Sequence, residues 1–289
     1  MGIRVGGVQS ASVTDDVDRN VASITAAARA AKSSFPDLRL LAFPELAVTG
    51  YACGARFHDH AVTWPRGGYL PALSALATEL NVVLVVGYAE QLGTYGLTAD
   101  SAAVIDADGR MLASYRKTHC LDRERETFVN GTQLPVLETA VGRLGVLICW
   151  DAAMPEAARS YAVQGADLLV VIGAWEDPYV EDWKLVVSAR AYDNVVPVLA
   201  VNRTGRERGA SFSGASRLVD CLGRVIASAD EEPDALITGL VDPDHTATTR
   251  KGYGSQLRDR RPELYTLVAT PLDCLPPPHG MGRTSLAHT

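Results

Sequence analysis

The stretch LGVLICWDAAMPEAARSY, residues 144–161, reads as a buried strand that turns directly into a helix. Residues 146–148 form an apolar run, as in a strand buried on both faces. Pro155 and Glu156 suit the first turn of a helix, where proline loses no hydrogen bond and a carboxylate faces the positive dipole end. Cys149 stands between the two elements, where backbone N–H groups favour the thiolate form. Cys149 is therefore a candidate nucleophile, although a free cysteine is more often a buried structural residue.

The same mixture of apolar strands and amphipathic helices continues on both sides of this stretch. Strands are predicted at residues 3–9, 38–43, 82–88, 167–172, 197–201 and 236–241. Helices are predicted after a cap at Thr14 or Asp15, from Pro71 to about Glu79, and from Glu181 to Asn194. Hairpins are predicted at residues 101–115 and 213–227, each around a turn that contains Asp and Gly. Because hairpins interrupt the strand–helix alternation, we expect an α/β protein with partly antiparallel sheets.

Composition and charge limit the classes of protein to which this chain can belong. The 289 residues are 47% hydrophobic and 21% charged, which is typical of a soluble globular protein. We expect one domain over residues 1–274 and an extended or mobile tail over residues 275–289. The net charge of −7 argues against a nucleic-acid partner, and no apolar run is long enough to span a membrane. Five scattered cysteines without a C-x-x-C pair predict reduced cytoplasmic thiols, with no zinc site.

Three ionisable residues, Glu45, Lys117 and Cys149, stand at the ends of predicted strands, where α/β proteins assemble their sites. A carboxylate, an ammonium and a thiol make a complete set for acyl transfer without a metal or organic cofactor. Glu45 is expected to remove the thiol proton and later to protonate the leaving nitrogen. Lys117 and a backbone N–H near Trp150 are expected to stabilise the developing negative charge. Taken singly, Glu45 also fits a solvated loop and Lys117 an exposed strand end.

The sequence around these residues resembles the nitrilase, or carbon–nitrogen hydrolase, superfamily. The three motifs occur in family order: LLAFPELAVTGY around Glu45, YRKTHC around Lys117 and GVLICWDAAMPEAAR around Cys149. The likeness extends from RVGGVQS near the N-terminus to RDRRPELY at residues 258–265. It implies a four-layer α-β-β-α sandwich of two mixed sheets, with Glu45 as general base, Lys117 as oxyanion stabiliser and Cys149 as nucleophile. It also implies a homodimer or larger homo-oligomer, for which residues 154–164 and the C-terminal tail are candidate interface segments.

The family usually carries a second glutamate in the loop after the lysine, a few residues before an aromatic residue and a glycine. Here the loop reads DRERETFVNG, residues 122–131. Counted back from Gly131, Glu124 matches that position best, and Glu126 is the alternative. The role that the resemblance implies is to hold Lys117 and to help to position the substrate amide. Both glutamates also fit a charged surface loop.

The residues after the cysteine bear on the substrate. Nitrilases typically carry Cys-Trp-Glu, whereas this chain has Asp151 in the third place. D-amino-acid carbamoylases carry arginines there that pair with the substrate carboxylate, and this chain has Ala152 and Ala153. Both departures leave linear amides and other N-carbamoyl compounds as the favoured substrates.

The segments around Cys149 and residues 194–207 look most like N-carbamoylputrescine amidases and related amidases, whose substrates carry an amine. Glu176 and Asp177 could bind such an amine through their carboxylates. The alternative is that both are solvated loop residues. Trp175 suits a pocket wall or the core. We therefore expect hydrolysis of a linear amide or N-carbamoyl substrate through a cysteine thioester, with release of ammonia. A nitrilase acting on a nitrile is the alternative, and the intact motifs disfavour a non-catalytic scaffold.

Overall fold

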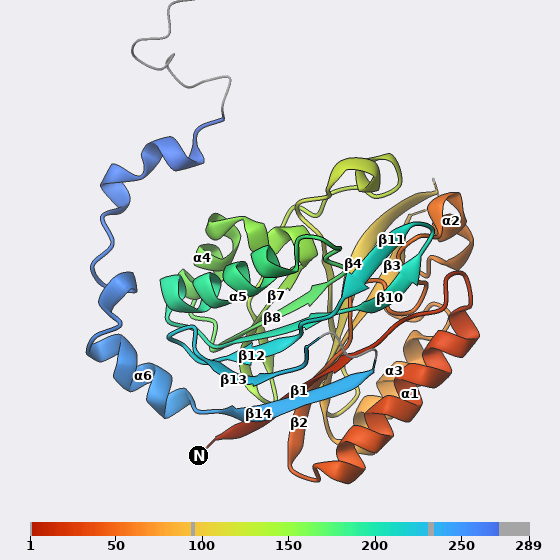
Figure 1. Ribbon diagram of the computed structural model, residues 1–289, viewed down its shortest axis with the longest axis horizontal. Helices are drawn as coiled ribbons and strands as arrows, with labels where there is room; N and C mark the ends of the chain where they lie inside the picture. The colour runs from red at the N-terminus through yellow and green to blue at the C-terminus, as the bar shows by residue number, and fades with distance from the viewer. Residues whose placement is uncertain (1, 94–95, 231–233, 272–289) are drawn as a thin grey trace, which may run out of the picture. The chain divides into compact units, whose positions relative to one another are not determined.

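Two six-stranded mixed sheets form the framework of the fold (Figure 1). The first sheet has the order β14-β1-β2-β3-β4-β5, with β1, β2 and β3 parallel and the other neighbours antiparallel. Its strands are β1 (Ile3–Gln9), β2 (Leu38–Ala42), β3 (Val83–Leu92), β4 (Leu97–Ile105), β5 (Met111–Arg116) and β14 (Ala235–Val241). The predicted hairpin over residues 101–115 is confirmed as β4 and β5.

The second sheet has the order β13-β12-β9-β8-β7-β6, with β7, β8 and β9 parallel. Its strands are β6 (Leu137–Thr139), β7 (Gly142–Ile148), β8 (Leu168–Gly173), β9 (Val198–Asn202), β12 (Arg217–Val219) and β13 (Val225–Ser228). A separate hairpin joins β10 (Thr204–Glu207) to β11 (Ala210–Ser213). The predicted hairpin over residues 213–227 is therefore wrong at its start. Gly214 and Ala215 have φ angles of 69° and 56°, which break the strand after Ser213.

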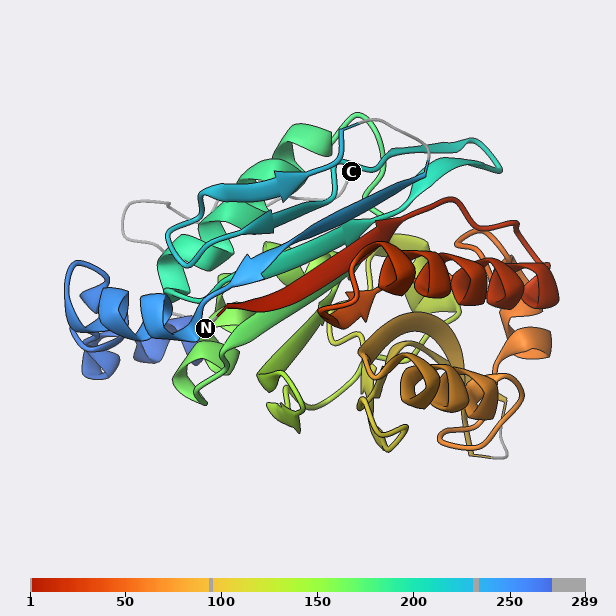
Figure 2. The ribbon, with the colours of Figure 1, turned by 90° about the horizontal axis from the view of Figure 1, so that it is seen from below.

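Helices cover the outer face of each sheet and complete four layers, which Figure 2 shows from the side. The helices are α1 (Val17–Ser34), α2 (Phe57–His60), α3 (Leu70–Leu80), α4 (Pro155–Val163), α5 (Val180–Asn194) and α6 (Pro243–Lys251). Helices α1 and α3 pack on the first sheet, and α4 and α5 pack on the second. The cap of α1 is Asp16 rather than Thr14 or Asp15, and α6 was not expected from the sequence. The arrangement confirms the predicted α-β-β-α sandwich.

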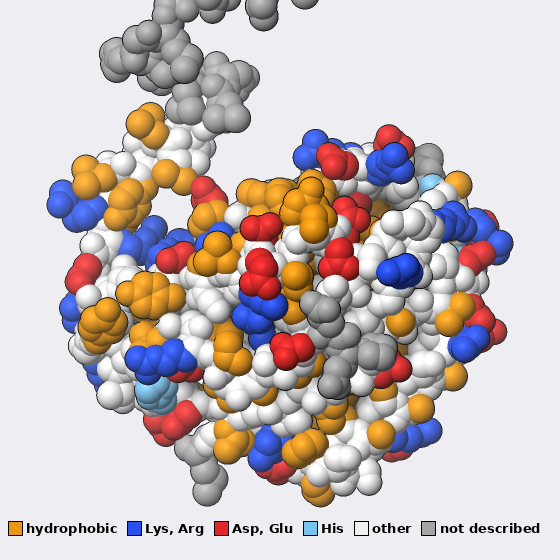
Figure 3. All heavy atoms as spheres, viewed as in Figure 1, with side chains coloured by type: hydrophobic (Ala, Val, Ile, Leu, Met, Phe, Trp, Pro, Cys, Tyr) orange, Lys and Arg blue, Asp and Glu red, His pale blue; other side chains and the backbone are white. Residues whose placement is uncertain are grey.

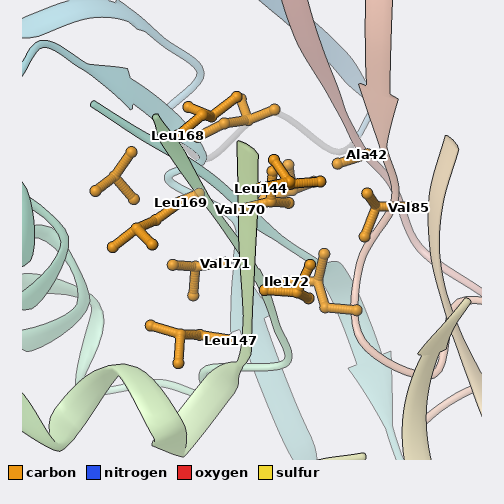
Figure 4. Packing of buried hydrophobic residues seen from close by; sticks show 14 of the residues in the cluster. Ala42, Val85, Leu144, Leu147, Leu168, Leu169, Val170, Val171 and Ile172 are labelled. Carbon is orange, nitrogen blue, oxygen red and sulfur yellow. The ribbon is translucent and has the colours of Figure 1, made fainter. Parts of the chain in front are cut away.

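The main core lies between the two sheets and continues under α4 and α5. In the middle of β8, Val170 points toward Val85 of β3, whereas Val171 points to the opposite side (Figure 4). Since side chains of a strand alternate between the two faces, β8 is buried on both, which explains its continuous apolar sequence. A second core fills the space between the first sheet and its two helices. Both cores hold the ends of the central strands in place, and the candidate site is built on these ends.

The structure is a computed structural model that describes residues 2–93, 96–230 and 234–271. All strands and helices above belong to a unit that spans Met1–Leu257. Arg258–Thr289 form a second unit, whose described part contains short 3₁₀ turns at Pro262–Leu264 and Thr266–Ala269. The predicted tail, residues 275–289, lies outside the described residues. Among the described residues, no helix is both long and apolar enough to cross a membrane.

Candidate active site

Glu45 stands in the turn that follows β2, and its side chain is fully buried. Its Oε2 accepts a hydrogen bond of 2.7 Å from the backbone N–H of Ala174, which follows β8. The turn passes against β3 at Gly87. A Cβ atom there would lie 2.3 Å from the carbonyl oxygen of Pro44 and 2.7 Å from Cα of Glu45. Because only glycine fits this close approach, the sequence of β3 helps to fix the position of Glu45.

Lys117 follows β5, and its ammonium lies between acidic side chains. Nζ donates hydrogen bonds of 2.6 Å to Glu45 and 2.8 Å to Glu124, and lies 3.6 Å from Asp100. The three acids could ligate a cation by their spacing, and here the ammonium takes that place. Burial alone lowers the pKa of Lys117, but Glu45, Cys149 and the other acids together raise it well above its usual value. The buried lysine is therefore a fixed positive charge.

Glu124 lies in a short 3₁₀ helix in the loop after Lys117. Its carboxylate also accepts hydrogen bonds of 2.7 Å from the hydroxyl of Tyr51 and 2.8 Å from the backbone N–H of Leu121. The side chain is 9% exposed, whereas Glu126 is exposed on the surface of the same turn. The structure thus brings Glu124, and not the alternative Glu126, into contact with Lys117.

Cys149 follows β7 with a φ angle of 46°, in the left-handed region that residues other than glycine rarely adopt. Backbone strain of this kind costs about 1–3 kcal/mol and is found at active sites. Burial, followed by the charge of Glu45, raises the pKa of Cys149 well above its usual value, whereas Lys117 lowers it. The predicted preference for the thiolate is therefore wrong. Although a short 3₁₀ helix, Cys149–Ala153, begins at this residue, burial has the larger effect on its pKa, so Cys149 is a thiol until a base removes its proton.

Asp151 ties the turn of Cys149 to the loop of Lys117. Its buried carboxylate accepts hydrogen bonds from both segments. The donors are the hydroxyl of Tyr115 (2.7 Å), the backbone N–H of Ile148 (3.0 Å), the hydroxyl and N–H of Thr118 (2.8 and 3.2 Å) and the N–H of His119 (2.9 Å), with Nδ1 of His119 also at 2.8 Å. Although burial raises the pKa of Asp151, these hydrogen bonds hold it below its usual value. The charged carboxylate of Asp151 therefore holds the turn of Cys149 and the loop of Lys117 together.

Cys149 opens onto a cavity of about 430 Å³. A neighbouring cavity of about 500 Å³ shares part of this lining, including Tyr51, Asp122 and Glu176. The apolar wall includes Trp150, Trp175 and Tyr179, and the acidic wall includes Asp122, Glu176 and Asp182. Figure 3 shows acidic and hydrophobic side chains gathered side by side on the face that carries α5. The space is apolar and large enough for a small organic substrate, with negative charge at its edge.

Only some of the residues that the sequence predicts to bind the substrate lie together on the cavity wall. Trp175 is 7% exposed, and its ring centroid lies 5.6 Å from that of Trp150, so it is both cavity wall and core. Glu176 is exposed on the cavity wall. Asp177 instead accepts a hydrogen bond of 2.5 Å from the hydroxyl of Ser213, which ties it to β11.

Sequence reasoning missed two side chains of the cluster, Tyr51 and Asp100. Tyr51 ends the motif LLAFPELAVTGY, so its place in the quoted segment was an available signal. Asp100 stands in the segment TADSAAVI, where an acid within an otherwise small and apolar strand was the signal. Both residues reach the site from the first sheet or the turn beside it, far in sequence from Cys149.

The carbon–nitrogen hydrolase family model matches residues 4–251 of the chain. A Schizosaccharomyces pombe protein named as a probable nitrilase is 38% identical over 272 residues, which cover 94% of this chain and 100% of that protein. The N-carbamoylputrescine amidase of Solanum lycopersicum is 35% identical over 280 residues, which cover 89% and 92% of the two chains.

Solved structures agree with these matches. A carbon–nitrogen hydrolase from Helicobacter pylori G27 superposes with a TM-score of 0.86 at 28% identity, covering 93% of this chain and 99% of that one. A mutant of the amidase from Nesterenkonia sp. AN1 superposes with a TM-score of 0.77 at 26% identity, covering 91% and 95%. That mutant shows covalent addition of the acetamide moiety of fluoroacetamide at its active site cysteine.

Proposed function

The chain belongs to the carbon–nitrogen hydrolase family, and from this premise we propose that it hydrolyses a linear amide or N-carbamoyl compound through a thioester on Cys149, releasing ammonia. The observation that carries the proposal is the buried pair of Glu45 and Lys117, 2.6 Å apart, in a site whose thiol opens onto a cavity. Removing two charges from water is costly. A pair of this kind next to a thiol suits an acyl-transfer site.

In the proposed reaction, Glu45 takes the proton of Cys149 as the sulfur attacks the carbonyl carbon. The negative charge that develops on the carbonyl oxygen is stabilised by the ammonium of Lys117 and by the backbone N–H of Trp150. Glu45 then returns the proton to the leaving nitrogen, and ammonia departs. Water, deprotonated by Glu45, hydrolyses the thioester and restores the thiol. Glu124 holds Lys117 and helps to orient the substrate amide.

Two observations support the roles of Cys149 and Glu45. The raised pKa of Cys149 means that a base must act during the attack. Among the neighbouring acids, Glu45 has the largest effect on the pKa of this thiol. The structurally similar amidase from Nesterenkonia sp. AN1 carries its adduct on the active site cysteine. Cys149 is the cysteine of this chain that lines the cavity, so it is the natural counterpart within the described residues.

The cavity lining supports a substrate with an apolar body and a cationic end. Trp150 and Trp175 offer aromatic faces to the body, and Glu176 offers a carboxylate to an ammonium group. A diamine that is carbamoylated on one nitrogen combines these properties, because its second amino group is protonated, and the relative from Solanum lycopersicum is named for such a substrate. Because Glu176 is exposed, its ion pair is worth at most about 1 kcal/mol, or roughly fivefold in KM.

Ammonia release from a substrate panel tests the proposal. The panel contains aliphatic amides, N-carbamoyl amines, N-carbamoyl amino acids and nitriles. Cys149→Ala is expected to lose activity at least about 1,000-fold, whereas Cys221→Ala, also at a buried cysteine, serves as the matched control. Activity that survives in Cys149→Ala would refute the thioester. Glu176→Gln is expected to raise KM for N-carbamoyl amines that carry a second, protonated amino group but not for neutral amides, and an equal effect on both would refute the acidic subsite.

A nitrile is the second candidate substrate, because the relative from Schizosaccharomyces pombe is named as a nitrilase. The thiol, the base and the cation serve that attack equally well, since the nitrile nitrogen also develops negative charge. The nitriles in the same substrate panel distinguish a nitrilase from an amidase. Fast nitrile hydrolysis with inert amides would make the chain a nitrilase.

We also propose a homodimer or larger homo-oligomer and a cytoplasmic location. Val163 of α4 and Tyr192 of α5 are 51% and 42% exposed, which suits a contact surface on these neighbouring helices. Light scattering tests the assembly, and a monomer at micromolar concentration would refute it. The free state of Cys53, Cys120, Cys149 and Cys221 fits a reducing compartment, which cell fractionation tests.

A further inference from the structure

Asp100 is a buried acid beside the site that the proposed mechanism does not use. It lies on the same face of β4 as Ala102 and Val104, which belong to the core between the sheets. Its side chain is fully buried, and neither carboxylate oxygen has a hydrogen-bond partner among the described residues. The ammonium of Lys117 lies 3.6 Å from Oδ2, and the backbone N–H of Lys117 binds the carbonyl of Asp100 at 2.9 Å.

Burial without hydrogen-bond donors destabilises the ionised form of a carboxylic acid relative to the neutral form. Glu45 and Glu124 already set two negative charges against the one positive charge of Lys117. Their oxygens lie within 4.8 Å of an oxygen of Asp100, so a third negative charge would be repelled by both. Burial, and after it the charge of Glu45, raises the pKa of Asp100 well above its usual value.

Within the described part of the chain, the neighbouring thiols do not supply a compensating charge. Cys120 lies in the loop after Lys117 and Cys149 follows β7, and burial raises the pKa of both thiols. Both are therefore neutral in the resting site. Lys117 is the cation that the cluster shares, and it already donates to the two glutamates.

We propose that Asp100 is a neutral carboxylic acid in the resting protein and a positioning residue for Glu45 and Lys117. The inference rests on the proposed function only for the roles of these two residues. A protonated Asp100 has an O–H that a neighbouring carboxylate can accept, so the proton turns repulsion between two acids into attraction. Glu45 is then held in place as the base.

A neutral Asp100 also favours the first chemical step. When Glu45 takes the proton of Cys149, the S–H bond breaks and an O–H bond forms, while one negative charge moves from oxygen to sulfur. The proton of Asp100 stays where it is. A negative charge on Asp100 would instead oppose the developing charge on sulfur.

Infrared difference spectroscopy tests the protonation state without any substrate. A protonated carboxylic acid has a carbonyl stretch that an ionised carboxylate lacks. We expect this band in the wild-type protein at neutral pH and its loss in Asp100→Asn. A band that is unchanged in Asp100→Asn would overturn the inference.

Asp106→Asn is the matched control, because Asp106 is also buried and directly follows β4. Unlike Asp100, Asp106 accepts hydrogen bonds of 2.9 Å from the N–H groups of Ala107 and Ala140 and from Arg110. These bonds hold its pKa below the usual value despite burial. Asp106→Asn is therefore expected to keep the infrared band.

Kinetics test the positioning role. Asp100→Ala is expected to lower kcat about 10- to 100-fold, the loss typical of a hydrogen bond to a charged group, with a smaller change in KM. Asp100→Asn is expected to recover most of that loss, because its amide is neutral and donates. A loss in the Asn variant as large as that in the Ala variant would overturn the role. If the band behaves as expected but the wild-type protein hydrolyses nothing in the panel, the proposed function fails while the neutral Asp100 is supported.

Discussion

Replacing Asp151 with asparagine tests whether one carboxylate holds the turn of the thiol and the loop of the lysine together. The amide keeps the shape of the side chain but turns one acceptor into a donor. If the amide oxygen takes the place of Oδ1, the nitrogen faces the hydroxyl of Tyr115 and the backbone N–H of Ile148. The hydroxyl can rotate and accept, but the N–H of Ile148 loses its partner. The opposite orientation deprives Thr118 and His119 instead.

The loss can be estimated from these contacts. A buried N–H without a partner destabilises the fold by about 1–3 kcal/mol, and losing the charge weakens the remaining bonds by roughly 1–2 kcal/mol. We therefore expect Asp151→Asn to lower the free energy of unfolding by about 2–5 kcal/mol, a large part of the roughly 5–15 kcal/mol of a typical domain. Since a shift of about 1 Å at a catalytic group reduces turnover about 100-fold, kcat is expected to fall by that order.

Urea denaturation and steady-state ammonia release measure the two effects. Tyr115→Phe is the matched control, because it removes one donor and leaves the carboxylate charged. Its expected loss of stability is about 1–2 kcal/mol, with a smaller loss of kcat. If Asp151→Asn lowered the free energy of unfolding by under about 1 kcal/mol and kept its kcat, the idea that the charged carboxylate holds the two segments together would be refuted.

Single contacts elsewhere give three more tests. Glu124→Gln is expected to lower kcat at least about tenfold through loss of a charged hydrogen bond, whereas the exposed Glu126→Gln keeps its kcat; equal losses would contradict the placement of Glu124. Gly87→Ala is expected to lower the free energy of unfolding by about 1–3 kcal/mol, because its Cβ would meet a backbone oxygen at 2.3 Å. Gly252→Ala, where the nearest atom lies 3.6 Å away, is the control in the same thermal denaturation, and equal stability of both variants would be the contrary result. The pKa of His119 is raised by its hydrogen bond to a carboxylate, so its stabilisation is complete below about pH 6.5 and is lost as pH rises through the higher folded value. Tm measured from pH 5.5 to about pH 8.5 should therefore fall more in wild type than in His119→Gln, and parallel curves would rule this out.

Local sequence was sufficient to predict the central strands and to single out the ionisable residues that follow them. The apolar runs of β3 and β8 and the second half of β7 are buried on both faces, so their pattern is continuous and easily recognised. Glu45, Lys117 and Cys149 follow strands whose ends meet, and short motifs mark all three. The start of the second hairpin failed because left-handed backbone at residues 214–215 leaves little trace in a pattern of side chains.

The charge states of the site could not be read from the sequence, because they depend on donors that come from distant segments. Asp100 and Asp106 stand six positions apart along one strand and its turn, and both are buried. Asp106 meets the N–H of Ala140 from the loop before β7, which stabilises the ionised form. Asp100 meets other acids and one shared ammonium, which favours the neutral form that we infer. Cys149 shows the same dependence, since the sequence of its turn predicts a thiolate, whereas burial and then the charge of Glu45 raise the pKa of the thiol.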